Sequence, residues 1–126
     1  MFKNSPAFSG FSSEDTGKLK TFYQDILGLE VEEIGGDMLT LHLATGGSVL
    51  IYPKEDHTPS TYTVLNFPVD SIDAAVTDLK AKGVGFERYE GSDENDIMRG
   101  IAANMGPDIA WFKDPSGNIL SVLQEA

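Results

Sequence analysis

The chain has 126 residues with a net charge of −11, from 20 acidic and nine basic residues. This length is typical of one domain. An anionic surface repels phosphate backbones and anionic lipid heads, which argues against nucleic-acid or membrane partners. The sequence has no Cys, which excludes disulfides, thiolate nucleophiles and zinc–thiolate sites. With no signal-peptide pattern and no apolar run near the roughly 20 residues that span a bilayer, we expect a cytoplasmic location.

Two segments have the spacing of amphipathic helices packed on one face. Over Asp15–Leu27 and Asp70–Lys82, apolar residues recur every three or four positions. The Asp that opens each segment is the expected N-cap, and Gly28 and Gly83 are the expected left-handed residues at the C-terminal ends. The two helices are therefore predicted to run from Asp to Gly over similar lengths.

One short strand is predicted before each helix and three after it, with turns rich in Gly, Asp and Pro between them. The eight strands are Ala7–Ser12, Leu29–Ile34, Met38–Ala44, Ser48–Lys54, Tyr62–Phe67, Val84–Tyr89, Asp108–Lys113 and Asn118–Gln124. The order is βαβββ twice, with modules over residues 5–54 and 61–126 and a polar linker over 55–60. We expect an α+β domain in which both modules form one curved mixed sheet around a concave cavity, with the helices on the convex face.

Residues 90–107 form the one long stretch without a periodic pattern. Connections of this length in compact domains are usually functional or disordered. Two interpretations stay open: a flap that closes over the cavity, and a connection without a role.

Two stretches of the sequence resemble a known family. FYQDILGL (residues 22–29) and FKDPSGN (residues 112–118) are similar to signature stretches of the vicinal oxygen chelate superfamily. Its members include glyoxalase I, extradiol dioxygenases, methylmalonyl-CoA epimerase, and fosfomycin and bleomycin resistance proteins. The resemblance covers nearly the whole chain and implies the doubled βαβββ fold and a homodimer. It does not fix the reaction, because one fold supports several chemistries.

The resemblance also implies a divalent metal held by His, Glu or Gln side chains at four strand positions. In this sequence those positions are Phe8, Ile51, Val64 and Ser121. Hydrocarbon side chains have no lone pair to donate, and a neutral hydroxyl is a poor ligand. The residues on either side of each position include no carboxylate or imidazole. We therefore expect no metal and no other cofactor.

Strand alternation predicts which side chains line the cavity. Trp111 offers a flat wall for stacking, with core packing as the alternative. His42 is either a half-buried hydrogen-bonding residue or a proton-transfer group, and no carboxylate can be placed beside it from the sequence. Arg99 is a candidate for holding an anionic ligand under the long loop. No catalytic residue is assigned, and the predicted ligand-binding residues are Phe8, His42, Ile51, Tyr62, Val64, Asn66, Trp111 and Ser121.

The leading hypothesis is a metal-free protein that binds an unknown small molecule without changing it, as the bleomycin resistance branch does by resemblance. One alternative is an enzyme, either a metal-dependent lyase or dioxygenase with a relocated site or a metal-free catalyst that uses His42. Another is an interaction module whose cavity has no ligand.

Overall fold

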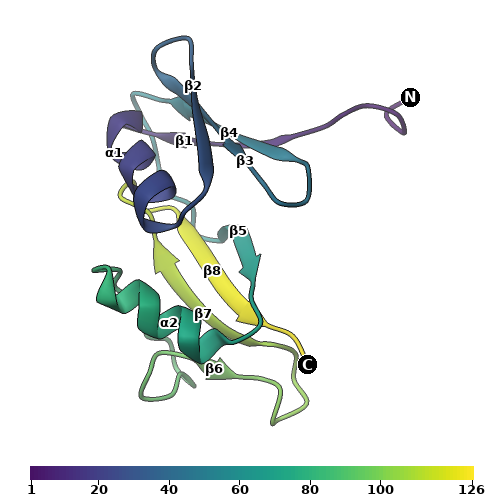
Figure 1. Ribbon diagram of the computed structural model, residues 1–126, viewed down its shortest axis with the longest axis vertical. Helices are drawn as coiled ribbons and strands as arrows, with labels where there is room; N and C mark the ends of the chain where they lie inside the picture. The colour runs from purple at the N-terminus through teal and green to yellow at the C-terminus, as the bar shows by residue number, and fades with distance from the viewer. The chain divides into compact units, whose positions relative to one another are not determined.

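The computed structural model describes all 126 residues. The chain divides into unit 1, Met1–Thr58, and unit 2, Pro59–Ala126, and the division falls inside the predicted linker. Each unit contains one helical segment and a four-stranded mixed sheet (Figure 1). The α+β class and the repeated βαβββ order are therefore confirmed. No helix in the chain has the length and hydropathy needed to cross a bilayer.

Unit 1 follows the predicted order closely. Its sheet has the strand order β1-β4-β3-β2, in which β1 and β4 are parallel and the other neighbours are antiparallel. The strands are β1 (Ser9–Ser13), β2 (Glu30–Ile34), β3 (Met38–His42) and β4 (Ser48–Pro53).

The helical segment of unit 1 is not one regular α-helix. It begins as α1 (Thr16–Thr21) and continues as the π-helical turn η1 (Phe22–Ile26). The Asp15 carboxylate caps the start by accepting a hydrogen bond from the Gly17 N–H, as predicted. Gly28 ends the segment with φ of +75°, also as predicted. Phe22 and Tyr23, which the apolar spacing places on the packed face, are both buried in η1, as predicted.

Unit 2 repeats the topology, with the strand order β5-β8-β7-β6. Only β5 and β8 are parallel. The helix α2 (Ile72–Ala81) lies against the sheet (Figure 1). The strands are β5 (Thr63–Pro68), β6 (Met98–Arg99), β7 (Asp108–Lys113) and β8 (Ile119–Gln124).

Two predictions for unit 2 are corrected. The N-cap of α2 is Ser71, whose hydroxyl accepts from the Ala74 N–H, and not Asp70. The predicted strand Val84–Tyr89 forms only one isolated bridge, Phe86 to Phe112. Two segments pair with the outer edge of β7. The strand β6 pairs with its first residues, Asp108 and Ile109, so the segment 84–89 forms only one bridge, near the end of β7 at Phe112.

Each sheet has one face covered by its helix, and the opposite face is called here the helix-free face. In unit 1, Phe11 lies on the covered face with its ring centroid 6.3 Å from that of Tyr23. In unit 2, Gln124 lies on the covered face, since its side-chain oxygen accepts from the Ile72 N–H of α2. The buried apolar side chains of the covered faces are Phe11, Leu39, Leu41, Val49, Ile51, Ala110, Phe112, Leu120 and Val122.

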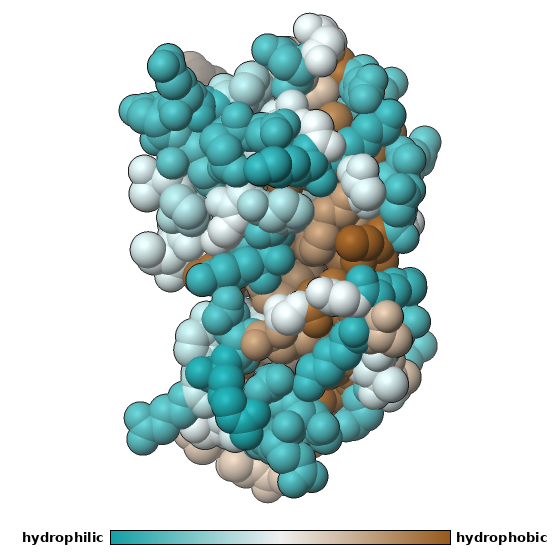
Figure 2. All heavy atoms as spheres, turned by 90° about the vertical axis from the view of Figure 1, so that its left-hand side faces the viewer, coloured by the Kyte–Doolittle hydropathy of each residue, from teal (hydrophilic) through white to brown (hydrophobic).

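The acidic composition is reflected at the surface. Most of the side chains on the face shown in Figure 2 are hydrophilic, with apolar atoms visible in the gaps between them. Burial of apolar side chains on the covered faces supplies the main stabilisation of each unit.

Candidate functional site

Three of the predicted ligand-binding residues lie side by side on the helix-free face of unit 2. The strand register places Asn66 on β5 opposite Ser121 on β8, and Ser121 opposite Trp111 on β7. The Ser121 hydroxyl is fully buried and donates to the carbonyl oxygen of Asn66. This bond occupies the Asn66 carbonyl and leaves the two amide N–H donors of that exposed side chain for another molecule.

Tyr89 also belongs to this group, although it is not among the predicted ligand-binding residues. Its ring lies 5.2 Å from that of Trp111, at an interplanar angle of 76°, which is an edge-to-face contact. The Glu87 N–H donates to the Trp111 carbonyl oxygen, so the backbone before Tyr89 runs along β7. Side-chain alternation within the predicted strand Val84–Tyr89 could have identified Tyr89, because it places Glu87 and Tyr89 on one side of the strand and Phe86 and Arg88 on the other.

Apolar side chains extend the surface around the two rings. Ile109 lies two residues before Trp111 on the same face, and the register pairs it with Leu123 on one side and Met98 on the other. All three are partly exposed. The aromatic patch is defined here as Tyr89, Met98, Ile109, Trp111 and Leu123. It combines a flat aromatic wall with the nearby Asn66 amide, a composition typical of small-molecule sites.

Three other predicted residues of the site lie at the start of strands. Phe8 precedes β1 and is 65% exposed, and Tyr62 precedes β5 and is 70% exposed. Val64 lies at a register shift in β5, between Thr63 and Leu65, and is partly exposed. None of the three has a polar contact that would fix a ligand.

Ile51 is placed differently from the prediction. It is fully buried on the covered face of unit 1, opposite Phe11 and Leu39. Because side chains alternate along a strand, its neighbours Leu50 and Tyr52 take the helix-free face instead. The prediction was therefore out of phase by one residue, and a side chain buried in this way cannot line a ligand site on the helix-free face.

His42 lies on the helix-free face of unit 1, as predicted, but it has a carboxylate partner. Its Nε2 atom lies 3.5 Å from Oε2 of Glu32, on the neighbouring strand. Both side chains are substantially exposed, so the pair contributes little to stability. The sequence could not show this contact, since it depends on the register between β2 and β3.

The other histidine has a structural position in unit 1. Nδ1 of His57 lies 2.7 Å from the Ser12 hydroxyl, and Nε2 lies 3.8 Å from the Glu14 carboxylate. The His57 side chain is only 2% exposed. It ties the segment after β4 to β1, next to the backbone bond from the Lys54 N–H to the Ser13 carbonyl.

The second signature stretch forms the turn between β7 and β8. One carboxylate oxygen of Asp114 accepts from the N–H groups of Ser116 and Asn118, at 2.8 and 3.0 Å. Asn118 in turn accepts from the Ser60 N–H, which holds the chain before β5. Asp114 is 4% exposed, so this part of the motif is a structural turn and not a surface that contacts ligand.

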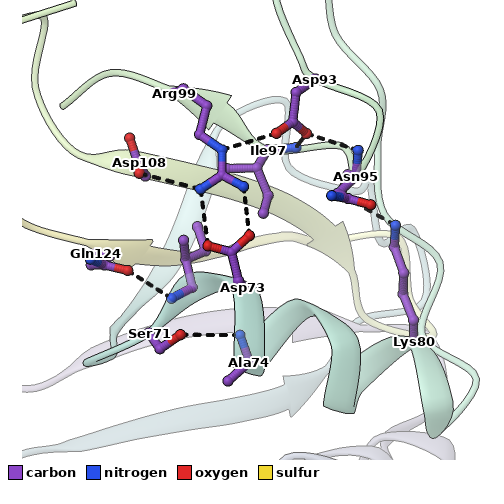
Figure 3. Close-up of polar contacts among 11 residues, drawn as sticks. Ser71, Asp73, Ala74, Lys80, Asp93, Asn95, Ile97, Arg99, Asp108 and Gln124 are labelled. Atoms are coloured by element: carbon purple, nitrogen blue, oxygen red, sulfur yellow. Dashed lines mark hydrogen bonds and ion pairs between the residues drawn. The ribbon is translucent and has the colours of Figure 1, made fainter. Parts of the chain in front are cut away.

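The long stretch 90–107 is fastened to the helix-covered side of unit 2 (Figure 3). The Arg99 guanidinium binds both carboxylate oxygens of Asp73 on α2, at 2.6 and 3.1 Å. It also donates to Asp93 at 2.9 Å and lies 3.5 Å from Asp108. The predicted role of Arg99 in holding an anionic ligand is not supported, because three carboxylates of the chain already surround it.

The same ion pairs shift the acidities of their carboxyl groups. The Arg99 hydrogen bonds lower the pKa of Asp73, and those from Lys80 and Arg88 lower the pKa of Asp96. Burial raises the pKa of Asp93, but hydrogen bonds from the Ile97 N–H and Arg99 outweigh it, so the net shift is downward. The ionised forms of these carboxyl groups therefore stabilise the fastened stretch.

The residues at the four family metal positions do not fit a divalent metal. Phe8, Val64 and the buried Ile51 have no donor atom, and the Ser121 hydroxyl is already bonded to Asn66. No three His, Asp or Glu side chains elsewhere in the chain gather into a set that could hold a metal ion. No step that depends on such a metal can be derived from these residues.

Comparison with known proteins identifies the family. The model of the Glyoxalase/Bleomycin resistance protein/Dioxygenase superfamily matches residues 10–122. No curated protein sequence matches the chain. Among solved structures, a glyoxalase/bleomycin resistance protein/dioxygenase from Alicyclobacillus acidocaldarius is 18% identical with a TM-score of 0.70, over 97% of this chain and 94% of that one.

Two further solved structures have the same fold, and each is described with a role of its own. The fosfomycin resistance protein FosX from Listeria monocytogenes is 16% identical with a TM-score of 0.69, over 95% of this chain and 92% of that one. TnmS3, an antibiotic binding protein from Streptomyces sp. CB03234, is 20% identical with a TM-score of 0.65, over 95% and 96%. With the motifs, the repeated topology and the family match together, this chain belongs to the glyoxalase/bleomycin resistance protein/dioxygenase superfamily.

Proposed function

We propose that this protein binds a small aromatic molecule on the aromatic patch of unit 2 and holds it without chemical change. The observation that carries the proposal is the edge-to-face pair of Tyr89 and Trp111, with Tyr89 42% exposed. An aromatic pair at the surface offers both a ring face and a ring edge to a flat ligand, and each such contact is worth about 0.5–1.5 kcal/mol.

The chemistry of the family metal positions supports binding over metal-dependent conversion. Hydrocarbon replaces the donor atoms at three of those positions, and the fourth is engaged with Asn66. TnmS3 is an antibiotic binding protein, and its role is compatible with sequestration of a small molecule in this fold. A resistance function in the cytoplasm, by capture of a toxic aromatic compound, is the form of the proposal we favour.

The first experiment is a thermal-shift screen of the purified protein against antibiotics, aromatic acids, thiol conjugates and divalent metals. A ligand that binds only the folded state raises the melting temperature. Trp111 is the single Trp of the chain, so its indole N–H gives one signal in a nitrogen–proton correlation spectrum. We expect an aromatic hit to shift that signal and to be recovered unchanged after incubation. Stoichiometric metal in the purified protein would contradict the metal-free part of the proposal.

A second candidate function rests on the His42–Glu32 pair. A carboxylate beside an imidazole can orient the ring for proton transfer, which would support a metal-free catalyst. In that case a hit from the screen would be converted to product, and His42→Gln would abolish that conversion. Recovery of unchanged ligand from the unmodified protein would exclude this candidate for that compound.

We also propose that the protein acts as a homodimer, since that is the assembly that the family resemblance implies. Light scattering or sedimentation measures this directly. A monomer at micromolar concentration would contradict the proposal without affecting the aromatic patch, whose residues all belong to unit 2.

A further inference from the structure

The basic residues of unit 2 are all engaged by carboxylates. Residues 59–126 contain five Lys and Arg residues against 11 Asp and Glu residues. Every one of the five has an ion-pair partner within 4.0 Å. These pairs are Lys80–Asp96, Lys82–Asp78, Arg88–Asp96, Arg99–Asp73 and Lys113–Glu87.

One of these pairs borders the aromatic patch. Lys113 lies two residues after Trp111 on β7, so both side chains are on the helix-free face. Its ammonium lies 3.4 Å from the carboxylate of Glu87, the residue whose N–H donates to the Trp111 carbonyl. Arg88 and Arg99 are turned the other way, to Asp96 and to the carboxylates around α2.

An anionic ligand on the aromatic patch would therefore meet Glu87 without a free cation to balance its charge. It could gain a partner only by breaking the Glu87–Lys113 pair, which leaves the Glu87 carboxylate uncompensated. A cationic ring would instead be attracted to the patch, because the faces of Trp111 and Tyr89 attract positive charge and unit 2 carries an excess of carboxylates.

We propose that the aromatic patch selects uncharged or cationic aromatic rings and rejects anionic ones, with Glu87 and Tyr89 as the residues that set this selectivity. The inference rests on the proposed function, since it concerns the ligand class of the same site. Tyr89 supplies a second ring face beside Trp111, and Glu87 supplies the negative charge and at the same time neutralises Lys113.

The test uses three probes of similar shape and different charge: N-methylquinolinium, quinoline and quinoline-6-carboxylate, at neutral pH. Each is titrated into the full chain while the Trp111 indole N–H signal is followed. We expect the cation to bind at least as tightly as the neutral ring, and the carboxylate to bind about tenfold more weakly than either, a difference of the size that one unbalanced charge produces.

Two substitutions with matched charge changes separate a local effect from net charge. Glu87→Gln removes a carboxylate and releases Lys113, so the carboxylate probe is expected to gain affinity about three- to tenfold. Asp78→Asn removes a carboxylate of α2 and releases Lys82, the C-cap residue of that helix, and it changes the net charge equally. We expect Asp78→Asn to leave the ratio between the probes unchanged.

A third pair of substitutions tests the role of Tyr89. Tyr89→Ala is expected to reduce the affinity for the cationic probe by about three- to tenfold, whereas Tyr89→Phe keeps the ring and the affinity. Met105→Ala, another exposed apolar residue of unit 2, is the control and is expected to have no effect.

The outcomes distinguish this inference from the proposed function. If none of the probes shifts the Trp111 signal, the binding function on this patch fails and the selectivity fails with it. If the probes bind but the carboxylate binds as tightly as the cation, or if Asp78→Asn changes the ratio as much as Glu87→Gln does, the selectivity is overturned and the binding function stands.

Discussion

The turns β3–β4 and β7–β8 occupy the same place in the two modules and share their backbone hydrogen bonds. In unit 1 the Leu43 N–H donates to the Gly47 carbonyl, and in unit 2 the Asp114 N–H donates to the Asn118 carbonyl. Their side chains differ, since a buried carboxylate braces the second turn and an exposed Thr hydroxyl makes one bond of 3.3 Å in the first. The same backbone turn thus occurs in both units, and of the two, the turn in unit 2 is the one stabilised by a buried carboxylate.

The helix-free faces of the two units also differ in their side chains. Unit 1 presents Thr40, His42 and the carboxylate of Glu32, whereas unit 2 presents the Trp111–Tyr89 pair with apolar neighbours. The two units have the same topology, so the chemistry of each helix-free face is determined by the side chains that its strands expose there. This difference favours unit 2 as the location of the proposed ligand binding, and experiments can test it.

The largest expected effect is on stability, in Asp114→Ala. Removing the carboxylate leaves the N–H groups of Ser116 and Asn118 without an acceptor in a buried turn, so we expect a loss of about 2–3 kcal/mol in the free energy of unfolding. Urea denaturation measures it. Thr45→Ala removes the corresponding side-chain bond in the exposed turn of unit 1 and should cost less than about 0.5 kcal/mol. Equal losses would show that the two turns are not differently anchored.

The glycines of the same turns sharpen the comparison. Gly117 and Gly46 both have positive φ, of +82° and +93°. A Cβ at Gly117 would lie 3.0 Å from the Pro59 side chain, whereas one at Gly46 meets nothing within 4 Å. We expect Gly46→Ala to cost about 1 kcal/mol from backbone strain alone and Gly117→Ala about 2 kcal/mol, because contact is added to strain. Thermal unfolding of the two variants compares them, and a larger loss for Gly46→Ala would contradict the contact.

For ligand binding, Trp111→Ala should weaken any aromatic hit by about tenfold, which corresponds to about 1.4 kcal/mol. His42→Gln on the other helix-free face should change the affinity by less than about twofold, as expected of an exposed pair outside the site. Calorimetric titration of both variants with the same compound gives the comparison. Unchanged affinity in Trp111→Ala would show that Trp111 has a packing role and does not bind the ligand.

The smallest expected effect concerns Arg99 and pH. The pKa values of Asp73, Asp93 and Asp96 are lowered from their usual 3.8, so their stabilisation is present above that pH and is lost as the pH falls through the lowered values. Arg99→Gln should lower the melting temperature slightly at neutral pH, and the difference from the unmodified protein should shrink as the pH falls below 3.8 and through the lowered pKa values of Asp73 and Asp93.

Thermal melts across this pH range measure the Arg99 effect. Lys82→Gln removes the exposed ion pair between Asp78 on α2 and the C-cap residue Lys82; this variant is the control and should show little difference at any pH. A difference for Arg99→Gln that persists in acid would mean that packing of the side chain, and not its ion pairs, holds the stretch 90–107.

Much of the fold was predictable because it depends on local signals. Gly28 and Gly83 end the helical segments where the sequence places them, and β7 begins and ends as predicted. The grouping of Asn66, Ser121 and Trp111 followed from two-residue alternation once the strand positions were known. By contrast, Ile51 was chosen from the family resemblance, and the structure buries it on the covered face of unit 1. The apolar run Val49 to Ile51 could not reveal this, because it fits either face of a strand equally well.

The sequence by itself determined the repeated βαβββ order, the turns, and the lack of donor side chains at the family metal positions, because these depend on residue identity and on near neighbours in the chain. Only the tertiary structure decided that Tyr89 meets Trp111, that Glu32 meets His42, and that Arg99 is bound by carboxylates on the covered side of unit 2. Those contacts join separate strands and loops, so they depend on strand register and loop course, which local periodicity does not encode.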